Sequence, residues 1–359
     1  MTKKPDMYER NRLLMVEEEK ELKVKGMILD PNDPTKMILK EEVLDENDII
    51  DYQPNAKEKK PYEPKTLEEY IGQEQSKDQI KASIRIINEL KPIHILLNGW
   101  AGCGKTALAR ITANMLNANF IYRVPEQLKN IDDLKKIINE IQATEKLTVF
   151  MLDEIHTIPI KVANVLLPIL QDGVYGNKNI RPFVMIGATT DKDKLIKKQA
   201  PLVSRFQTQI TLDKYTPEEL STILRNYKVS SFPNRPINEE DYNIIAENSR
   251  GIPREAIALL LQRLVSDNME EVLFRGDIIK EGLNAIDIKI LQTLSKLEKP
   301  VGASYLSQAV GIPQADYEII YERYLIEKKL VYRQARGRVI SEKGLEFLAI
   351  LQQGEGDEK

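Results

Sequence analysis

A glycine-rich turn between an apolar segment and a helical segment constrains the fold of this chain more than any other feature. Residues 93–98 form a short apolar run, and residues 106–116 repeat apolar side chains with helical spacing. The turn between them reads Gly99-Trp-Ala-Gly-Cys-Gly-Lys-Thr106, which matches the pattern G-x-x-x-x-G-K-T/S. A loop of this kind presents backbone N–H groups to a phosphate, and the dipole of the following helix favours the negative charge. The sequence therefore predicts an α/β domain that binds a nucleoside triphosphate.

Individual residues of this P-loop have predicted contacts with ATP and Mg²⁺, the two cofactors that the pattern implies. Lys105 would reach the β- and γ-phosphates, and the Thr106 hydroxyl would ligate the metal. The other nucleotide contacts predicted in the loop are Gly99, Gly102, Cys103, Gly104 and Ala107. Trp100 is interpreted either as a packing residue or as an exposed contact at the tip of the loop.

A pair of carboxylates follows the P-loop at the end of another apolar strand. Residues 147–152 lead directly into Asp153 and Glu154. Asp153 would hold the hydrated Mg²⁺, and Glu154 would polarise the attacking water. A module that only binds nucleotide needs no second carboxylate, so the pair predicts hydrolysis. Of the two histidines, His156 is expected to orient this site, and His94 is expected to be a core residue.

Strands and helices alternate from residue 65 to residue 213. Further strands are expected at 120–124, 147–152, 183–188 and 208–212, and further helices at 73–90, 131–142 and 161–170. Near-continuous apolar strands separated by helices predict a parallel sheet that helices cover on both faces.

The strand pattern stops after residue 215. Helices are expected at 216–229, 237–249 and 253–267, and the first of them has the start signal Thr216-Pro217-Glu218-Glu219. Helices near 285–297, 303–310 and 315–328, followed by short strands at 330–334 and 338–341, indicate a winged helix-turn-helix. The predicted domains are a large α/β ATPase domain at 63–214, a small helical domain at 215–283, a winged helix at 284–353 and an acidic tail at 354–359.

Residues 1–62 have the composition of an acidic appendage. They hold 12 Lys or Arg against 15 Asp or Glu, which accounts for the net charge of −3 of the whole chain. A charged helix is expected at 7–25, and prolines interrupt 26–61, so we expect partial order at best.

Composition excludes several classes of protein. One cysteine and two histidines exclude a disulfide framework and a multi-cysteine zinc site. No apolar run reaches the ~18 residues of a membrane helix, and no apolar leader begins the sequence, so we expect a cytoplasmic protein without a membrane partner.

A basic cluster lies near the end of the chain. Residues 328–343 carry six Lys or Arg against one Glu. Arg333, Arg336 and Arg338 flank a glycine at the predicted ribbon tip, where a wing would approach DNA, and we expect contacts to phosphates rather than to bases. The alternative is a solvated charged face that binds nothing.

The order of motifs resembles that of an AAA+ ATPase and, more narrowly, that of the RuvB family of Holliday-junction branch-migration motors. The motifs are Glu69-Tyr-Ile-Gly-Gln73, the P-loop, Asp153-Glu-Ile-His156, Gly187-Ala-Thr-Thr190, Pro201-Leu-Val-Ser-Arg-Phe206 and Gly251-Ile-Pro-Arg254. The resemblance covers residues 62–351 and implies a ring hexamer that acts on duplex DNA. It also implies that Tyr70 and Ile71 contact the adenine.

The same resemblance implies roles for residues that lie far from the P-loop in sequence. Thr190 resembles sensor 1, with Thr189 as the alternative if the register shifts by one residue. Arg205 resembles the arginine finger that reaches the ATP of the neighbouring subunit. Arg254 resembles sensor 2, with capping or pairing on its helix as the alternative.

Several features depart from the family pattern. Residues 173–182 are much shorter than the hairpin that RuvB proteins use to engage RuvA, which puts a RuvA-like partner in doubt. The P-loop has Trp-Ala-Gly-Cys where the family typically has Pro-Pro-Gly and one more residue, Val203 replaces an arginine, and the N-terminal extension has no counterpart. A divergent relative is indicated, and phage origin is one reading of that divergence.

The sequence thus predicts an ATP-hydrolysing motor of the RuvB type that translocates on Holliday junctions or other branched DNA in recombination, repair or replication. Two alternatives stay open. A clamp-loader-like AAA+ ATPase would share the motifs but would usually end in a helical collar. An ATP-gated DNA-binding switch would bind DNA with little motor activity.

Overall fold

The computed structural model describes residues 62–297 and 299–354, together with the backbone of residues 27–30 and 33–39. The chain consists of two compact units, Met1–Lys59 and Lys60–Lys359. In the first unit, β1 (Met27–Asp30) pairs antiparallel with β2 (Asp33–Leu39). This hairpin is not expected from the sequence, because Pro34 reads as a turn signal, although a proline is tolerated near the first residue of a strand. The helix expected at 7–25 lies outside the described residues.

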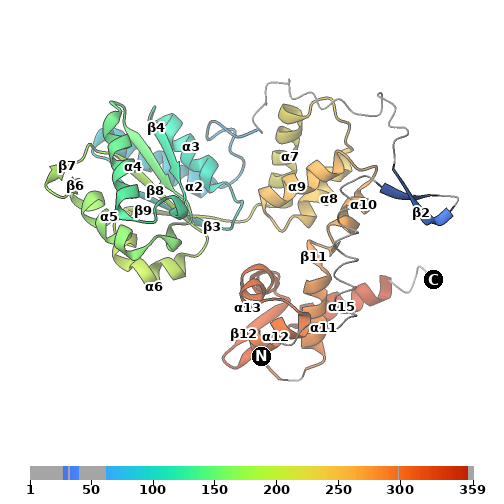
Figure 1. Cartoon of the computed structure of the whole chain (residues 1–359). Helices are drawn as coiled ribbons and strands as arrows, with labels where there is room; N and C mark the ends of the chain where they lie inside the picture. Colours follow the sequence, from blue (N-terminus) through green and yellow to red (C-terminus); the bar gives the residue numbers. More distant parts are fainter. Residues whose placement is uncertain (1–26, 31–32, 40–61, 298, 355–359) are drawn as a thin grey trace. The chain divides into compact units, whose positions relative to one another are not determined.

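Five parallel strands form the sheet of the second unit, in the order β4-β5-β8-β3-β9 (Figure 1). They are β3 (Ile95–Gly99), β4 (Asn119–Arg123), β5 (Thr148–Leu152), β8 (Val184–Thr189) and β9 (Thr208–Leu212). The predicted parallel sheet is confirmed. Because the strands run parallel, their carboxyl ends share one edge, and this edge receives both the P-loop after β3 and Asp153 after β5.

Five helices pack against the sheet. They are α2 (Glu74–Glu89), α3 (Lys105–Met115), α4 (Ile131–Ala143), α5 (Ile160–Asp172) and α6 (Lys192–Val203). The sequence does not predict α6, because Pro201 lies inside it and Gln199 has a non-helical backbone conformation.

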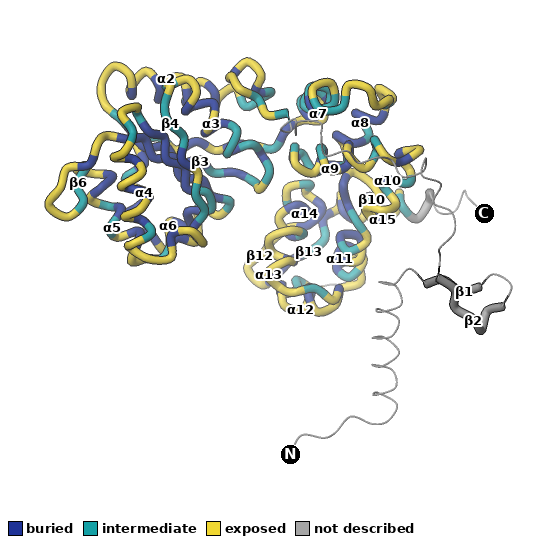
Figure 2. Tube along the Cα trace, turned by 45° about the horizontal axis from the view of Figure 1, so that its top comes forward, coloured by how far each residue is buried: buried dark blue, intermediate teal, exposed yellow. Residues whose placement is uncertain are grey.

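The two faces of the sheet pack against different helices. Ile95 and Leu97 of β3 belong to a core cluster with α2 and α3, whereas Leu96, between them, belongs to a cluster with α4, α5 and α6. Figure 2 shows the strands as a buried interior beneath helices whose outer sides are exposed. Burial on both faces explains why the central strands β3, β5 and β8 are mostly apolar, whereas the edge strands β4 and β9 carry exposed polar residues.

A short hairpin connects α5 to β8. Strands β6 (Val174–Tyr175) and β7 (Lys178–Asn179) pair over two residues each, and Gly176 in their turn has a φ of +60°. This is the segment that the sequence analysis identifies as much shorter than a RuvA-binding hairpin.

Four helices follow β9 in succession, with no strand between them. They are α7 (Pro217–Ser231), α8 (Glu239–Asn248), α9 (Pro253–Arg263) and α10 (Met269–Arg275). The predicted start of α7 is confirmed: Thr216 Oγ1 accepts a hydrogen bond from the Glu219 N–H at 3.3 Å, and Glu219 Oε2 accepts one from the Thr216 N–H at 2.9 Å. This reciprocal pair satisfies backbone donors that a helix leaves unpaired.

The C-terminal region is a winged helix. Its elements are β10 (Ile278–Lys280), β11 (Leu283–Asn284), α11 (Ala285–Ser295), α12 (Ala303–Val310), the continuous helical segment α13 (Gln314–Asp316), η3 (Tyr317–Glu322) and α14 (Arg323–Glu327), then β12 (Val331–Gln334), β13 (Gly337–Ile340) and α15 (Glu342–Gly354). The segment α13–η3–α14, called the recognition helix below, corresponds to the helix expected at 315–328. The sequence does not predict α15. Among the described residues, no helix combines the length and the apolar character that crossing a membrane requires.

His94 is a buried core residue, as expected. Its Nδ1 accepts a hydrogen bond from the Met185 N–H at 3.0 Å, and its Nε2 lies 3.0 Å from the Leu170 carbonyl oxygen. Burial lowers the pKa of His94 to about 4, against about 6.5 in an unfolded chain. Below pH 6.5 the unfolded chain therefore binds a proton that the folded protein excludes, and stability falls as the pH falls toward 4.

We predict that this imidazole reduces the free energy of unfolding by about 2 kcal/mol between pH 7.5 and pH 5. Denaturant titrations at the two pH values measure the loss. In His94→Gln, which keeps a donor and an acceptor without titrating, the loss becomes smaller by that amount. An identical pH dependence in the variant contradicts the assignment.

Candidate functional site

Two glycines give the P-loop its shape. Gly102 and Gly104 have φ values of +82° and +92°, which L residues with side chains rarely adopt. A Cβ at Gly102 would lie 2.6 Å from the Cβ of Arg254, and a Cβ at Gly104 would lie 2.7 Å from the hydroxyl of Tyr70. The loop is therefore packed closely between the start of α9 and the segment before α2.

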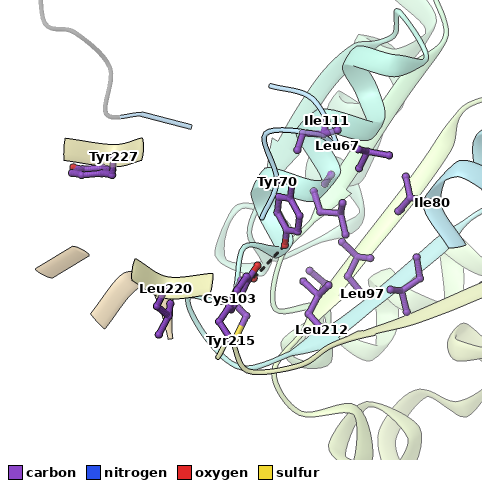
Figure 3. Packing of buried hydrophobic residues seen from close by; sticks show 14 of the residues in the cluster. Leu67, Tyr70, Ile80, Leu97, Cys103, Ile111, Leu212, Tyr215, Leu220 and Tyr227 are labelled. Atoms are coloured by element: carbon purple, nitrogen blue, oxygen red, sulfur yellow. Dashed lines mark hydrogen bonds between the residues drawn. The ribbon is translucent and has the colours of Figure 1, made fainter. Parts of the chain in front are cut away.

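Two tyrosine hydroxyls meet at one carbonyl oxygen of the loop (Figure 3). The carbonyl of Cys103 accepts a hydrogen bond from Tyr70 at 3.3 Å and another from Tyr215 at 3.2 Å. All three residues are buried. Burial raises the pKa of Cys103 to about 11, so its thiol stays protonated at neutral pH and is unreactive.

A cavity of about 760 Å³ lies beside the P-loop. The predicted residues that line it are Tyr70, Ile71, Gly102, Gly104, Lys105, Thr106, Ala107, Asp153, Glu154 and Arg254. The helices α7 and α9 add apolar side chains, namely Ile223, Tyr227 and Ile257. Its size, with a few polar groups among apolar walls, fits a nucleotide whose base lies against the apolar part. Gly99 and Cys103 do not line this cavity. Their carbonyl oxygens accept hydrogen bonds, that of Gly99 from Lys105 and that of Cys103 from Tyr70 and Tyr215.

Lys105 is almost fully buried at the cavity wall. Its Nζ donates hydrogen bonds to the carbonyl oxygens of Gly99 at 2.9 Å and Trp100 at 2.8 Å. Burial lowers the pKa of Lys105, and the carboxylates of Glu154 and Asp153 oppose this shift by favouring the ammonium form. The lysine therefore lies between the loop carbonyls and the carboxylate pair.

Glu154 is held in one orientation by its neighbours. Its backbone has a φ of +44°, an uncommon conformation for glutamate. Its Oε2 accepts a hydrogen bond from Thr190 Oγ1 at 2.9 Å and lies 3.2 Å from Nδ1 of His156. Thr189 Oγ1 instead lies 3.0 Å from the same ring nitrogen. The structure thus brings Thr190, not Thr189, to Glu154.

His156 stands beside this carboxylate without a charge at neutral pH. Burial lowers the pKa of His156, and the opposing effect of Glu154 is smaller. A neutral ring that contacts Glu154 orients the carboxylate, as the sequence analysis expects of this residue.

The residues at the cavity fit a magnesium ion that is held jointly with phosphate. The described residues include no cluster of three or more His, Cys, Asp or Glu side chains that would hold a metal alone. Asp153 accepts hydrogen bonds from the Glu154 N–H at 3.0 Å and from Tyr122 at 3.2 Å, and both Asp153 and Thr106 line the cavity. Mg²⁺ commonly takes one or two protein oxygens and completes its shell with phosphate and water.

The two predicted arginines differ in position. Arg254 lines the cavity from the start of α9. Arg205 does not line it: one guanidinium nitrogen donates to Ser204 Oγ at 3.0 Å, and its Nε has no hydrogen-bond partner among the described residues. The expected role of Arg205 at the site of a neighbouring protomer stays a prediction.

The predicted DNA-contacting arginines are not equivalent, and one of them requires a correction. Arg333 and Arg336 are exposed on β12 and in the turn of the wing. Arg338 is 8% exposed, and its guanidinium donates to both carboxylate oxygens of Glu322 at 2.6 and 2.9 Å. Its charge is therefore neutralised inside the domain, and we remove Arg338 from the proposed DNA surface.

Sequence reasoning missed two tyrosines of the site. Tyr122 reaches Asp153 because β4 lies next to β5, and Tyr215 reaches the P-loop from the segment between β9 and α7. Tyr122 carries no local signal, since the strand order is not written in the sequence. The position of Tyr215 directly before the start signal of α7 is the one clue that was available.

Comparisons with known proteins agree with this geometry. Residues 62–212 match the family model of the Holliday junction DNA helicase RuvB P-loop domain, and residues 280–349 match that of the RuvB C-terminal winged helix domain. The RuvB subunit of the Holliday junction branch migration complex of Fervidobacterium nodosum is 33% identical over 312 residues, which cover 79% of this chain and 88% of that protein. The corresponding subunit of Thermosipho melanesiensis is 32% identical, and the match covers 82% of this chain and 100% of that protein.

Solved structures of RuvB proteins have a similar fold. The RuvB Holliday junction branch migration motor of Thermotoga maritima superposes with a TM-score of 0.67 at 31% identity, and the match covers 80% of this chain and 97% of that one. The ORC2 protein of Aeropyrum pernix shares the fold, with a TM-score of 0.52 at 16% identity.

We predict that two arginines of the wing differ strongly in their contribution to stability. Arg338→Met leaves Glu322 buried without its partner and lowers the free energy of unfolding by about 3–5 kcal/mol. The matched Arg336→Met change, at an exposed position, alters it by about 0.5 kcal/mol or less. Denaturant unfolding of the full chain measures both. Equal stability of the two variants contradicts the internal role of Arg338.

Proposed function

This chain belongs to the RuvB family, and from that premise we propose that it hydrolyses ATP to move branched DNA, including Holliday junctions. The winged helix at the C-terminus, with Arg333 and Arg336 exposed on its wing, supports DNA as the polymer on which it acts. We propose a ring oligomer, a hexamer by analogy with the family, and a cytoplasmic location. The two-residue strands of the β6–β7 hairpin argue against a RuvA-like partner at that position.

The observation that carries the proposal is the fixed position of Glu154 at the cavity. A carboxylate that Thr190 and His156 orient, one residue after Asp153 and in the same cavity as Lys105, is arranged for hydrolysis rather than for binding alone. Its backbone strain is of the kind that proteins keep at functional sites.

Each residue has a distinct task in this proposal. Bound ATP with Mg²⁺ supplies the phosphoryl group that is transferred to water. Lys105 binds the phosphates, Thr106 and Asp153 provide the protein oxygens for the metal, and Glu154 accepts the proton of the attacking water. Thr190 and His156 keep the Glu154 carboxylate in place, and Tyr70 and Ile71 hold the base.

Two arginines would link hydrolysis to movement. Arg254, which lines the cavity from α9, would respond to the phosphates and shift the small helical domain. Arg205 would complete the site of the next protomer, and an arginine in that position contributes about 10³-fold or more to the rate of related NTPases. Loss of Arg205 would therefore stop turnover without abolishing ATP binding.

We predict that Glu154→Gln binds ATP as the wild type does but hydrolyses it at least about 10²-fold more slowly, because the amide cannot accept the proton. Glu145→Gln, at an exposed position in the turn before β5, is the matched control and keeps wild-type turnover. Phosphate release and equilibrium nucleotide binding are the measurements. Undiminished turnover in Glu154→Gln removes the assigned base.

DNA substrates separate this function from its alternatives. Wild-type protein should hydrolyse ATP faster with a four-way junction than without DNA, and it should separate the arms of that junction only when ATP is hydrolysed. DNA binding without strand separation would indicate an ATP-gated switch. Stimulation that depends on a ring-shaped protein partner would indicate a clamp loader.

A further inference from the structure

Trp100, the second residue of the P-loop, lies between two cations from distant parts of the chain. The Arg323 guanidinium carbon is 3.9 Å from the centre of the indole ring, and Lys214 Nζ is 4.2 Å from it. Arg323 is the first residue of α14, and Lys214 lies between β9 and α7. Cations are attracted to the face of an indole ring more strongly than to any other aromatic side chain. One side chain of the P-loop thus contacts the recognition helix directly.

Further contacts hold the end of the recognition helix in the same place. Lys214 Nζ also lies 2.7 Å from Glu327 Oε2 and 4.5 Å from the ring centre of Tyr324, both on α14. The Arg250 guanidinium carbon lies 4.7 Å from the centre of the same ring, and Arg250 also pairs with the buried Asp287 at 2.6 Å. The contact at Trp100 is therefore part of a connected set of charged and aromatic groups, not an isolated surface pair.

The backbone of Trp100 is tied to the nucleotide site. Its carbonyl oxygen accepts a hydrogen bond from Lys105 Nζ at 2.8 Å. Lys105 is also the residue that must contact the phosphates, so a bound triphosphate competes with the Trp100 carbonyl for the same ammonium group. The carbonyl of Trp100 thus faces the nucleotide lysine while its ring faces the recognition helix.

We propose that Trp100 is a positioning residue that couples occupancy of the nucleotide site to the placement of the recognition helix. This inference rests on the proposed function, since it requires ATP at the P-loop and DNA at the winged helix. A triphosphate that draws Lys105 from the Trp100 carbonyl changes how the indole holds Arg323. By linkage, DNA that engages the winged helix changes the affinity for nucleotide by the same factor.

The sequence makes this coupling measurable, because Trp100 is the single tryptophan of the chain. Tryptophan emission, excited selectively over the 14 tyrosines, therefore reports on the surroundings of Trp100. The first measurement is its emission with a non-hydrolysable ATP analogue, with duplex DNA and with both. The second is the affinity for duplex DNA with and without the analogue, at a protein concentration where light scattering gives every variant the same mass.

Four variants distinguish coupling from simple packing. Trp100→Phe keeps an aromatic face, Trp100→Ala removes it, and Arg323→Gln removes the cation. Lys289→Gln, which removes an exposed cation from α11 of the same domain, is the control. A role limited to packing would lower thermal stability in Trp100→Ala without changing how the analogue affects DNA binding.

In the wild type and in Lys289→Gln, we expect the analogue to change DNA affinity by about 5-fold to 150-fold, the usual range for coupled sites. In Trp100→Ala and Arg323→Gln the ratio of DNA affinities with and without the analogue falls to within about 2-fold of one. Trp100→Phe keeps most of the wild-type ratio. In Arg323→Gln the emission no longer responds to DNA. A full ratio in Trp100→Ala, or wild-type emission that responds to neither ligand, overturns the inference.

A competition assay with a fluorescent nucleotide separates this failure from failure of the proposed function. If wild-type protein does not bind the analogue, both proposals fall. If all variants bind it equally, DNA stimulates turnover and the affinity ratio is still unchanged in Trp100→Ala, only the coupling through Trp100 is refuted.

Discussion

The conformation of the P-loop backbone is the constraint on which the rest of the site depends. The Cys103 carbonyl receives hydroxyl groups from Tyr70, before α2, and from Tyr215, before α7, and Gly102 and Gly104 have no room for a side chain. These contacts are buried, where an unmade hydrogen bond costs about 1–3 kcal/mol. The loop is thus held by the segment before α2 and the segment before α7. A change of loop conformation on nucleotide binding would therefore alter the contacts of both segments.

The second constraint is the edge at which parallel strands end. Because β3 and β5 share that edge, Lys105, Asp153 and Glu154 meet in one cavity although about fifty residues separate the loop from the carboxylates. Thr190, at the end of β8 between these strands, is placed by the same rule. The strand order therefore fixes the positions of the proposed catalytic groups, as the two glycines fix the conformation of the loop.

The sequence predicts those elements whose formation depends on residues close together in the chain. Burial on both faces leaves apolar runs in the central strands β3, β5 and β8, which the sequence therefore predicts. The start of α7 is predictable because its signal acts within one turn. The partner of Arg338 was not found, because Glu322 lies on a helix whose path around the wing depends on packing across the whole domain. The role of Trp100 is likewise not predictable from the sequence, because its partner Arg323 lies in a distant segment of the chain. The contact of Tyr122 with Asp153 is not predictable because it depends on the strand order. The sequence does not predict α6 because Pro201 lies inside it, where the non-helical backbone of Gln199 accommodates the proline.

The central claim is that ATP is hydrolysed in a pocket that Arg205 of a neighbouring protomer completes. Mixing equal amounts of Glu154→Gln and Arg205→Ala proteins, each inactive alone, tests it most directly. In randomly mixed rings, one interface in four joins an intact Glu154 to an intact Arg205, so recovery of about one quarter of wild-type turnover is expected. If light scattering shows mixed oligomers and no turnover returns, the shared pocket is contradicted.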